Sequence, residues 1–291
     1  MADARHDLSD LRDLLARHLP DRPVRSIVQL GRGSDNVVYD VDDDLIVRCR
    51  IEAADPQRSE TIRAEATLLH TVARWSTLPV PEPVFVDVDA GALAYRKVPG
   101  VALSTYTVTD ARRLGTALGE FLGALHDVPL DAVAGLVARD DYPLSAWLDD
   151  ARRDYGQIRS HLPAELRSPI EDFLAHTPPT QPDVAVFCHN DLGAEHIMVD
   201  AATGAITGVI DWTDAALTDP MRDLALVFRD LGPPVLTPTL EAYSRDVGAE
   251  DQQRLAFYAR CSVLEDIAYG LRTGVRAYAE AGIAHLRWTF A

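Results

Sequence analysis

The chain has 291 residues, of which 47% are hydrophobic and 25% are charged, a composition typical of a folded globular protein and not of a disordered one. It carries 28 Lys and Arg against 45 Asp and Glu, a net charge of −17, which disfavours nucleic acid as a partner because both surfaces are negative. The same charge is typical of a well-solvated surface and also suits a cationic substrate, and the total charge does not separate these readings.

The cysteines and the N-terminal residues bear on the location of the protein. Cys49, Cys188 and Cys261 are far apart and odd in number, which is not the pattern of a disulfide framework. The N-terminal segment lacks the apolar core of a signal peptide, and no run of 18 or more apolar residues occurs. We therefore expect a cytoplasmic protein that does not interact with membranes.

The first hundred residues are expected to form a strand-rich lobe. Leucines recur at helical spacing from Leu8 to Leu19, which predicts a helix. The expected elements that follow are strands at 24–30, 36–41 and 45–50, a helix at 59–74, and strands at 84–89 and 92–98. A glycine-bearing turn, GRGSD, joins the first two strands. Pro99 and Gly100 break the chain, so the expected lobes are residues 1–98 and 99–291.

The second lobe is expected to be mostly helical. Asp110–His126 places five large apolar residues on one helical face, and residues 143–162 and 163–176 also have helical character. Between residues 184 and 212, short apolar segments alternate with polar turns, which predicts a strand hairpin. Helices resume at Pro220. A strand-rich part followed by a helical part predicts an α+β fold with two lobes.

The densest polar cluster of the chain, CHNDLGAEHIMVD, lies at residues 188–200 between two apolar segments. A turn with helix caps needs fewer polar groups than this, so a metal or acid–base site is favoured. Twenty residues after Asp191, Asp211 follows an apolar segment in GVIDW. Two carboxylates at the ends of neighbouring strands suit Mg²⁺ beside phosphates, because Mg²⁺ prefers a few hard oxygen ligands.

Phosphoryl transfer needs an acid for the attacking hydroxyl, a carboxylate-held metal and a cation on the phosphates. Asp191 suits the first role and Asp211 the second. The cation is expected in LIVRCR, where Arg48 interrupts an apolar strand. Glu65 on the following helix is its expected partner, with Glu60 as a competitor. Arg50, on the same side of the strand, is the alternative if the register differs by two residues.

Two segments, HNDLGAEHIMVD and GVIDWTDAALTDPMRDLA, resemble the catalytic core of the aminoglycoside/macrolide phosphotransferase family. The resemblance extends over nearly the whole chain. LGRGSDNVVYDV resembles the phosphate-covering hairpin of that family, LIVRCR its basic strand, LAYRKVPG its hinge and LGEFLGALHDVP its long helix. It implies a bilobal protein-kinase-like fold, with a small antiparallel-sheet lobe and a larger, mostly helical lobe.

The resemblance also implies roles for individual residues. Asp191 matches the acid that orients the acceptor hydroxyl, and His189 matches the histidine that supports its loop. Asp211 matches the metal-binding aspartate, and His196 stands where an Asn ligand is usual. Imidazole is a softer ligand for Mg²⁺ than an amide oxygen, so a structural role for His196 is the alternative. Arg48 stands where protein kinases have Lys, and it can hold two phosphate oxygens at once.

ATP or GTP is the implied phosphoryl donor, with Mg²⁺ as the metal. Gly31, Gly33 and Ser34 are expected to let backbone N–H groups approach the phosphates. The hinge residues Arg96 and Val98 are expected to offer backbone groups to the purine.

The acceptor pocket is expected near the C-terminal helices. Glu265, Asp266 and Tyr269 lie within about one helical turn, and with Asp214 they are the candidates for binding an acceptor with cationic groups. A solvated helix face is the alternative for each of them. In TDPMRDLA, Asp219 and Asp223 are interpreted as structural. Asp219 is expected to cap the helix that begins at Pro220, and Asp223 to brace the catalytic loop.

The favoured function is transfer of the γ-phosphate to a hydroxyl of an aminoglycoside, macrolide or nucleoside antibiotic, giving resistance. The alternatives are a metabolic kinase for an amino alcohol, sugar or nucleoside, and a nucleotide-binding protein without activity. A metallohydrolase would use the two histidines and two aspartates of the site as ligands, but it leaves the glycine turn and Arg48 unexplained. The expected partner is a small molecule, and the expected state is a monomer or weak dimer.

Overall fold

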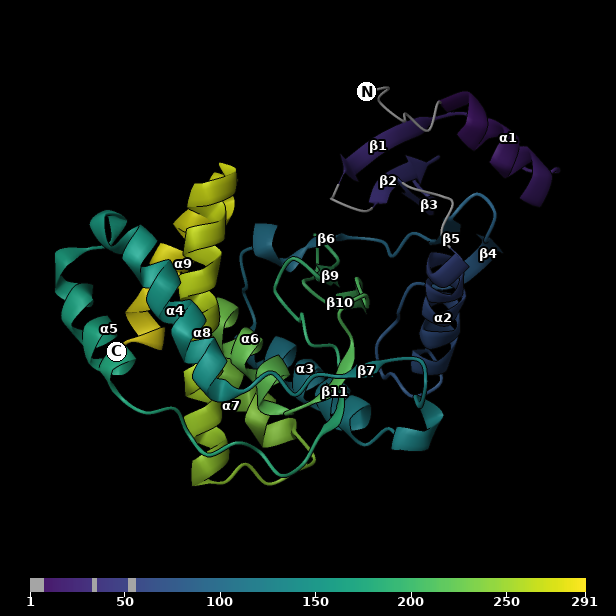
Figure 1. Ribbon diagram of the computed structural model, residues 1–291. Helices are drawn as coiled ribbons and strands as arrows, with labels where there is room; N and C mark the ends of the chain where they lie inside the picture. The colour runs from purple at the N-terminus through teal and green to yellow at the C-terminus, as the bar shows by residue number, and fades with distance from the viewer. Residues whose placement is uncertain (1–7, 33–35, 52–55) are drawn as a thin grey trace. The chain divides into compact units, whose positions relative to one another are not determined.

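The computed structural model describes residues 8–32, 36–51 and 56–291 (Figure 1). The chain divides into two compact units, one of residues up to Pro99 together with Gly208–Ile210, and one of Gly100–Thr207 together with Asp211–Ala291. The sequence expectation placed Gly208–Ile210 in the second lobe. These residues join the first unit because the N–H of Val209 donates to the carbonyl of Pro79 at 2.9 Å. Among the described residues, no helix combines the length and apolar character needed to cross a bilayer.

The first unit is built on a five-stranded antiparallel sheet in the order β1-β2-β3-β5-β4. Its elements are α1 (Leu8–His18), β1 (Ile27–Arg32), β2 (Asn36–Val41), β3 (Leu45–Arg50), α2 (Pro56–Val72), β4 (Pro83–Asp87) and β5 (Ala92–Arg96). The ranges expected for β2 and β3 are confirmed. The expected strand at 24–30 is wrong by about three residues, because the N–H groups of Arg25 and Ser26 bind the Asp42 carboxylate and not a neighbouring strand.

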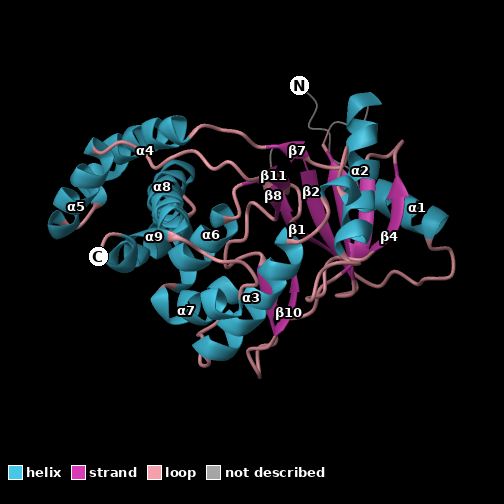
Figure 2. Cartoon of the chain, turned by 90° about the horizontal axis from the view of Figure 1, so that it is seen from below, coloured by secondary structure: helices cyan, strands magenta, loops and turns pink. Residues whose placement is uncertain are grey.

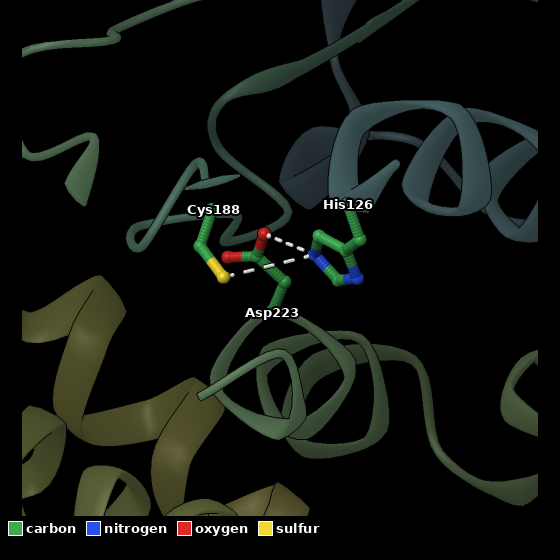
Figure 3. A group of neighbouring side chains, drawn as sticks. All are labelled: His126, Cys188 and Asp223. Atoms are coloured by element: carbon green, nitrogen blue, oxygen red, sulfur yellow. Dashed lines mark hydrogen bonds and ion pairs between the residues drawn. The ribbon is translucent and has the colours of Figure 1, made fainter. Parts of the chain in front are cut away.

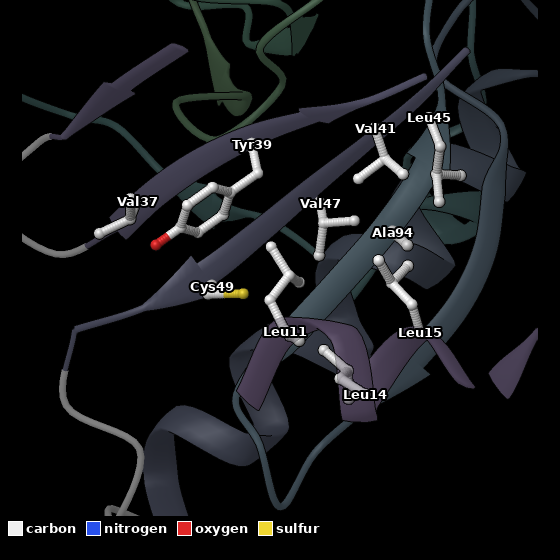
Figure 4. Packing of buried hydrophobic residues seen from close by; sticks show 11 residues of the cluster. Leu11, Leu14, Leu15, Val37, Tyr39, Val41, Leu45, Val47, Cys49 and Ala94 are labelled. Carbon is white, nitrogen blue, oxygen red and sulfur yellow. The ribbon is translucent and has the colours of Figure 1, made fainter. Parts of the chain in front are cut away.

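One face of this sheet is apolar and is covered by α1 (Figure 4). Alternate residues of a strand point to the same face, so every second residue of β2 and β3 is available to the core. The side chains that meet there are Leu11, Leu14 and Leu15 of α1 with Val37, Tyr39, Val41, Leu45, Val47, Cys49, Ala92 and Ala94 of the strands. Arg48 alternates with these residues and therefore belongs to the opposite face.

The second unit is mostly helical (Figure 2). Its long helices are α3 (Ala111–His126), α4 (Leu144–Ile158), α5 (Ala164–Ala175), α6 (Met221–Leu231), α7 (Pro233–Ala242), α8 (Ala249–Thr273) and α9 (Arg276–Thr289). The expected apolar face of α3 is confirmed, since Leu114, Leu118, Phe121, Leu122 and Leu125 are all buried. The expected helices at 143–162 and 163–176 are present as α4 and α5, with a short 3-10 turn, Arg159–His161, between them.

Short strands are inserted among these helices and carry the loops of the candidate site. They are β6 (Val101–Ala102), β7 (Ala138–Arg139), β8 (Val186–Cys188), β9 (Ile197–Val199), β10 (Ile206–Val209) and β11 (Ala216–Thr218). They form two three-stranded sheets, in the orders β10-β9-β6 and β7-β11-β8. The loop 189–196 therefore starts from one sheet and ends in the other.

Candidate active site

The loop from His189 to His196 connects β8 to β9, and side chains of helix α6 hold it by hydrogen bonds. The carboxylate of Asp223 accepts the backbone N–H of His189 at 2.9 Å and that of Asn190 at 2.7 Å. Asp223 is fully buried, which works against its charge, but these bonds and the one from His126 outweigh burial and lower the pKa of Asp223. The structural role expected for Asp223 is confirmed.

Behind this contact, Asp223 lies beside His126 and Cys188 in a fully buried group (Figure 3). His126 Nε2 lies 3.1 Å from Asp223, and His126 Nδ1 lies 2.6 Å from the Tyr243 hydroxyl. A neutral imidazole satisfies both contacts, with Nε2–H donating to the carboxylate and Nδ1 accepting from the phenol. The three side chains are close enough to hold a metal ion. Because the carboxylate already serves the loop backbone, we interpret the group as a structural brace.

Asp191 is the acid that this loop presents. Its side chain is 42% exposed, and burial of the remainder raises the pKa of Asp191 above the ordinary value. The backbone N–H of Asp191 donates to Nδ1 of the fully buried His189 at 3.3 Å. His189 therefore supports the loop conformation, as expected for it, and the tilted ring of Trp212 packs against it with ring centroids 4.6 Å apart.

His196 and Asp211 lie next to Asp191. His196 Nδ1 is 2.7 Å from the backbone oxygen of Asp191, and His196 Nε2 is 3.8 Å from Asp211 Oδ2. Burial lowers the pKa of His196, but the charge of Asp191, the backbone hydrogen bond and the charges of Glu195 and Asp211 outweigh it and raise that pKa. The Thr213 hydroxyl donates to Asp211 Oδ1 at 2.6 Å and fixes the carboxylate.

Two of the four described residues other than glycine with positive φ lie at this site. Asn190 has φ of 70° and Asp211 has φ of 62°, in the left-handed region that residues other than glycine rarely occupy. Asp42 and Asp43, in the turn between β2 and β3, are the other described residues of this kind. Such strain persists where the surroundings impose it, and at Asn190 the Asp223 carboxylate does so.

Asp191 opens into an acidic cavity of about 620 Å³ that lies within the second unit, bounded by α4, α6 and α8. Seven carboxylates line it together with four arginines: Asp140, Asp150, Asp154, Asp191, Asp214, Glu265 and Asp266, with Arg153, Arg222, Arg229 and Arg272. Three of the arginines form ion pairs with Asp150, Asp140 and Asp266. Burial raises the pKa of Asp154, of Glu265 and, to about 7, of Asp266.

The predicted acceptor residues are distributed unevenly around this cavity. Asp214, Glu265 and Asp266 line its wall, whereas Tyr269 packs its ring edge-on against Tyr278, with centroids 5.3 Å apart, outside the lining. Sequence reasoning missed the contribution of α4 and the segment before it, which supply Asp140, Asp150 and Asp154. The DDYPLSAWLDDARRD pattern marks five acids within one helix and just before it, but it does not indicate which cavity they line.

A second, more apolar cavity of about 810 Å³ lies within the same unit and reaches the loop at Ala194 and Glu195. Its wall includes Leu103, Val108, Ala194, Val235, Ala281 and Trp288, with Glu195 and Tyr278 among its polar groups. Arg229 and Asp266, joined at 2.9 Å, line both cavities.

The candidate phosphate-binding residues lie in the first unit. Arg48 forms an ion pair with Glu65 of α2, as expected, and both side chains are largely buried. The side chain of the competitor Glu60 lies outside the described residues, as do Gly33 and Ser34. At Gly31, a Cβ atom would meet nothing within 4 Å. In the hinge, Val98 is buried, and the Arg96 N–H donates to the Glu82 carbonyl at 2.9 Å.

Comparison with known proteins identifies the relatives of this chain. The model of the family described as "Phosphotransferase enzyme family" matches residues 26–258. The chain belongs to this family. The aminoglycoside 3'-phosphotransferase of Streptomyces fradiae is 30% identical over 62% of this chain and 71% of that protein. That of Streptomyces ribosidificus is 31% identical over 67% of this chain and 77% of that protein.

A solved structure shows the same fold. The GDP complex of aminoglycoside 2'-phosphotransferase-IIIa superposes with a TM-score of 0.71 at 20% identity, covering 98% of this chain and 99% of that one. The predicted family and the predicted protein-kinase-like α+β fold are thus confirmed. This phosphotransferase acts on an alcohol group, as the relatives named as phosphotransferases and kinases do.

Proposed function

We propose that this phosphotransferase transfers the γ-phosphate of ATP or GTP to a hydroxyl of a cationic, aminoglycoside-like antibiotic and so gives resistance to it. The observation that carries the proposal is that Asp191 opens into a cavity where carboxylates outnumber arginines. After the ion pairs are removed from the count, Asp154, Asp191, Asp214 and Glu265 face one arginine, Arg272, among the described lining residues.

Buried carboxylates that repel one another gain free energy when a cation binds between them. Burial and then the charge of Asp154 raise the pKa of Glu265, and burial raises the pKa of Asp154, a state that an ammonium group would relieve. Relatives named aminoglycoside 3'-phosphotransferase support the same class of acceptor.

The donor set next to Asp191 fits a magnesium ion. A carbonyl oxygen only accepts, so the contact with the Asp191 backbone requires the proton of neutral His196 on Nδ1 and leaves a lone pair on Nε2. Nε2 and Asp211 Oδ2 are 3.8 Å apart, within the span of about 4.2 Å that two bonds of about 2.1 Å can bridge. Bound there, Mg²⁺ would neutralise charge on the phosphates.

In the proposed reaction, Asp191 accepts the proton of the acceptor hydroxyl while the oxygen attacks the γ-phosphorus and the bond to the leaving nucleoside diphosphate breaks. The raised pKa of Asp191 makes its carboxylate a better proton acceptor than an ordinary aspartate. Arg48, positioned by Glu65, is the proposed cation for phosphate oxygens, with Gly31, Gly33 and Ser34 as backbone donors. The bound GDP of aminoglycoside 2'-phosphotransferase-IIIa supports a nucleotide donor.

The experiment is an acceptor screen with ATP and GTP over aminoglycosides, macrolides, nucleoside antibiotics and simple amino alcohols, with mass detection of the phosphorylated product. We expect aminoglycosides to be phosphorylated in a magnesium-dependent way. If only amino alcohols are phosphorylated, the proposed resistance function is wrong and a metabolic role takes its place.

The apolar cavity favours a second candidate, an acceptor that combines an amine with a large apolar ring, such as a macrolide. Its volume of about 810 Å³ suits such a ring. Glu195, on the loop that carries Asp191, would meet the amine. Replacing Ala281 in the wall by Trp distinguishes the candidates, because only turnover of the apolar acceptor would fall.

A further inference from the structure

Helix α6 contacts the catalytic loop at a second point. Asp230 lies seven residues after Asp223, two helical turns along, so both side chains point from the same face of α6. Asp230 Oδ2 accepts the backbone N–H of Ala194 at 2.8 Å, three residues after Asp191. The two aspartates therefore hold the loop on both sides of Asp191.

The backbone of Ala194, which this contact holds, is also held by other hydrogen bonds. The carbonyl of Ala194 accepts the N–H of Ser104 at 3.0 Å, so both polar groups of this residue are bound. The N–H of His196 donates to the carbonyl of Gly193 at 3.0 Å, which closes a turn around Ala194. This turn brings the His196 ring back to the backbone oxygen of Asp191. A displacement of Ala194 would therefore move His196 relative to Asp191.

The carboxylate of Asp230 is itself held in place. Its side chain is 7% exposed and pairs with Arg229 Nε at 2.6 Å, and His285 Nδ1 lies 3.6 Å away. Arg229 also forms an ion pair with Asp266 of α8, with Nη1 2.9 Å from Oδ2. Burial works against the charge of Asp230, but Arg229 and the Ala194 N–H outweigh it and lower the pKa of Asp230. The anchor is thus a charged acceptor, which binds an N–H more strongly than a neutral one.

We propose that Asp230 is a positioning residue for phosphoryl transfer, which acts through the backbone of Ala194 to set the geometry between Asp191 and His196. The proposal rests on the roles proposed for these two residues. Asp223 holds the beginning of the loop and Asp230 its end, so the loop keeps its shape only while both bonds are present. Neither Asp230 nor Ala194 lines the acidic cavity proposed for the acceptor, although both line the apolar cavity.

The test compares Asp230→Ala and Asp230→Asn with a matched control, Asp219→Asn. Asp219 is also a buried aspartate beside α6 that pairs with an arginine, Arg254 Nε at 2.8 Å, and its carboxylate accepts the N–H of Met221 at 3.1 Å. It gives no side-chain bond to the catalytic loop among the described residues. All three variants remove a buried carboxylate that pairs with an arginine, and the free energy of unfolding of each is measured beside kcat.

We expect Asp230→Ala to lower kcat about 10-fold or more at a temperature where all variants are folded, because small misplacements of reacting groups are costly. KM for the nucleotide and the acceptor should stay within about 2-fold. Asp230→Asn keeps an acceptor oxygen for Ala194 and should lose less kcat; it also serves if the alanine variant does not fold. Exchange of the Ala194 amide hydrogen, followed by NMR, should accelerate in the Asp230 variants and not in Asp219→Asn.

The proposal is overturned if the Asp230 variants keep wild-type kcat, if Asp219→Asn loses as much kcat as they do, or if exchange at Ala194 is unchanged. A failure of the proposed function would look different, because Asp191→Ala would then retain turnover. If Asp191→Ala is inactive and Asp230→Ala is normal, only the positioning role is wrong.

Discussion

Arg48 illustrates how far single residues can be placed from the sequence. A charged residue inside an apolar strand indicates a function, and Glu65 on the following helix was the expected partner. The roles of Asp223 and His189 in the loop were also expected, because both residues stand in segments that resemble the catalytic core of the family. Asp230 was not, since it lies outside those segments and its bond to Ala194 depends on how α6 packs against the loop.

Replacing Arg48 by Ala should raise KM for the nucleotide about 10-fold or more, because a charged hydrogen bond to phosphate is lost. Glu65→Ala should have a smaller effect in the same direction, since the guanidinium stays but is no longer held. Initial rates at varied nucleotide concentration measure both, with Arg74→Ala, an exposed residue of the same unit, as the control. An unchanged KM for Arg48→Ala would remove this residue from the nucleotide site.

The lowered pKa of Asp223 predicts how stability depends on pH. A carboxyl group with a folded pKa below its unfolded value of about 3.9 stabilises the fold above that value, and the contribution disappears as pH falls through the folded pKa. Denaturant unfolding of wild type and Asp223→Asn should therefore differ most above the unfolded pKa, for example near pH 6, and the difference should shrink as the pH falls through the lowered pKa of the folded state. A difference that grows on acidification would contradict the assigned charge.

Helices α3 and α7 show what element prediction achieves and misses. The leucine spacing of α3 identified its buried face correctly. The same helix contains three glycines, Gly115, Gly119 and Gly123. Their role in close helix packing cannot be inferred from the apolar pattern. A Cβ atom at Gly119 would overlap the backbone oxygen of Thr239 in α7, so close approach of the two helices requires glycine there.

Gly119→Ala should accordingly destabilise the protein by about 1–3 kcal/mol, as overpacking does. Gly156→Ala is the matched control: Gly156 lies in α4, and a Cβ there would meet nothing within 4 Å. That variant should gain about 0.5–1 kcal/mol from the better helix propensity of alanine. Equal stability of the two variants by denaturant unfolding would contradict the packing of α3 on α7.

At the scale of the whole molecule, composition gave the negative sign of the net charge but not the place where the carboxylates gather. The net charge of −17 permitted a solvated surface or a cationic substrate. The folded second unit gathers seven carboxylates around one cavity from segments more than 100 residues apart in the chain. Asp140, Asp150 and Asp154 could not be assigned to it from the sequence, because only the tertiary fold brings α4 to α8.

The acidic cavity predicts that turnover of a cationic acceptor depends on salt. Raising the ionic strength from about 0.01 M to 0.5 M shortens the screening length from about 30 Å to a few ångströms. KM for an aminoglycoside should rise several-fold while kcat stays nearly constant, because the attraction acts on binding. KM for the nucleotide, an anion, should not rise in parallel. Acceptor KM values independent of salt would argue against an electrostatic role for the cavity.

The most direct test of the account is the rate of acceptor phosphorylation by Asp191→Asn at saturating nucleotide, magnesium and acceptor. Asn keeps the shape of the side chain but cannot accept the hydroxyl proton. We predict that kcat falls by about 10²- to 10⁴-fold, with nucleotide binding measured by calorimetry unchanged. A variant that keeps kcat within a few-fold of wild type would contradict the central claim that Asp191 acts on the acceptor hydroxyl.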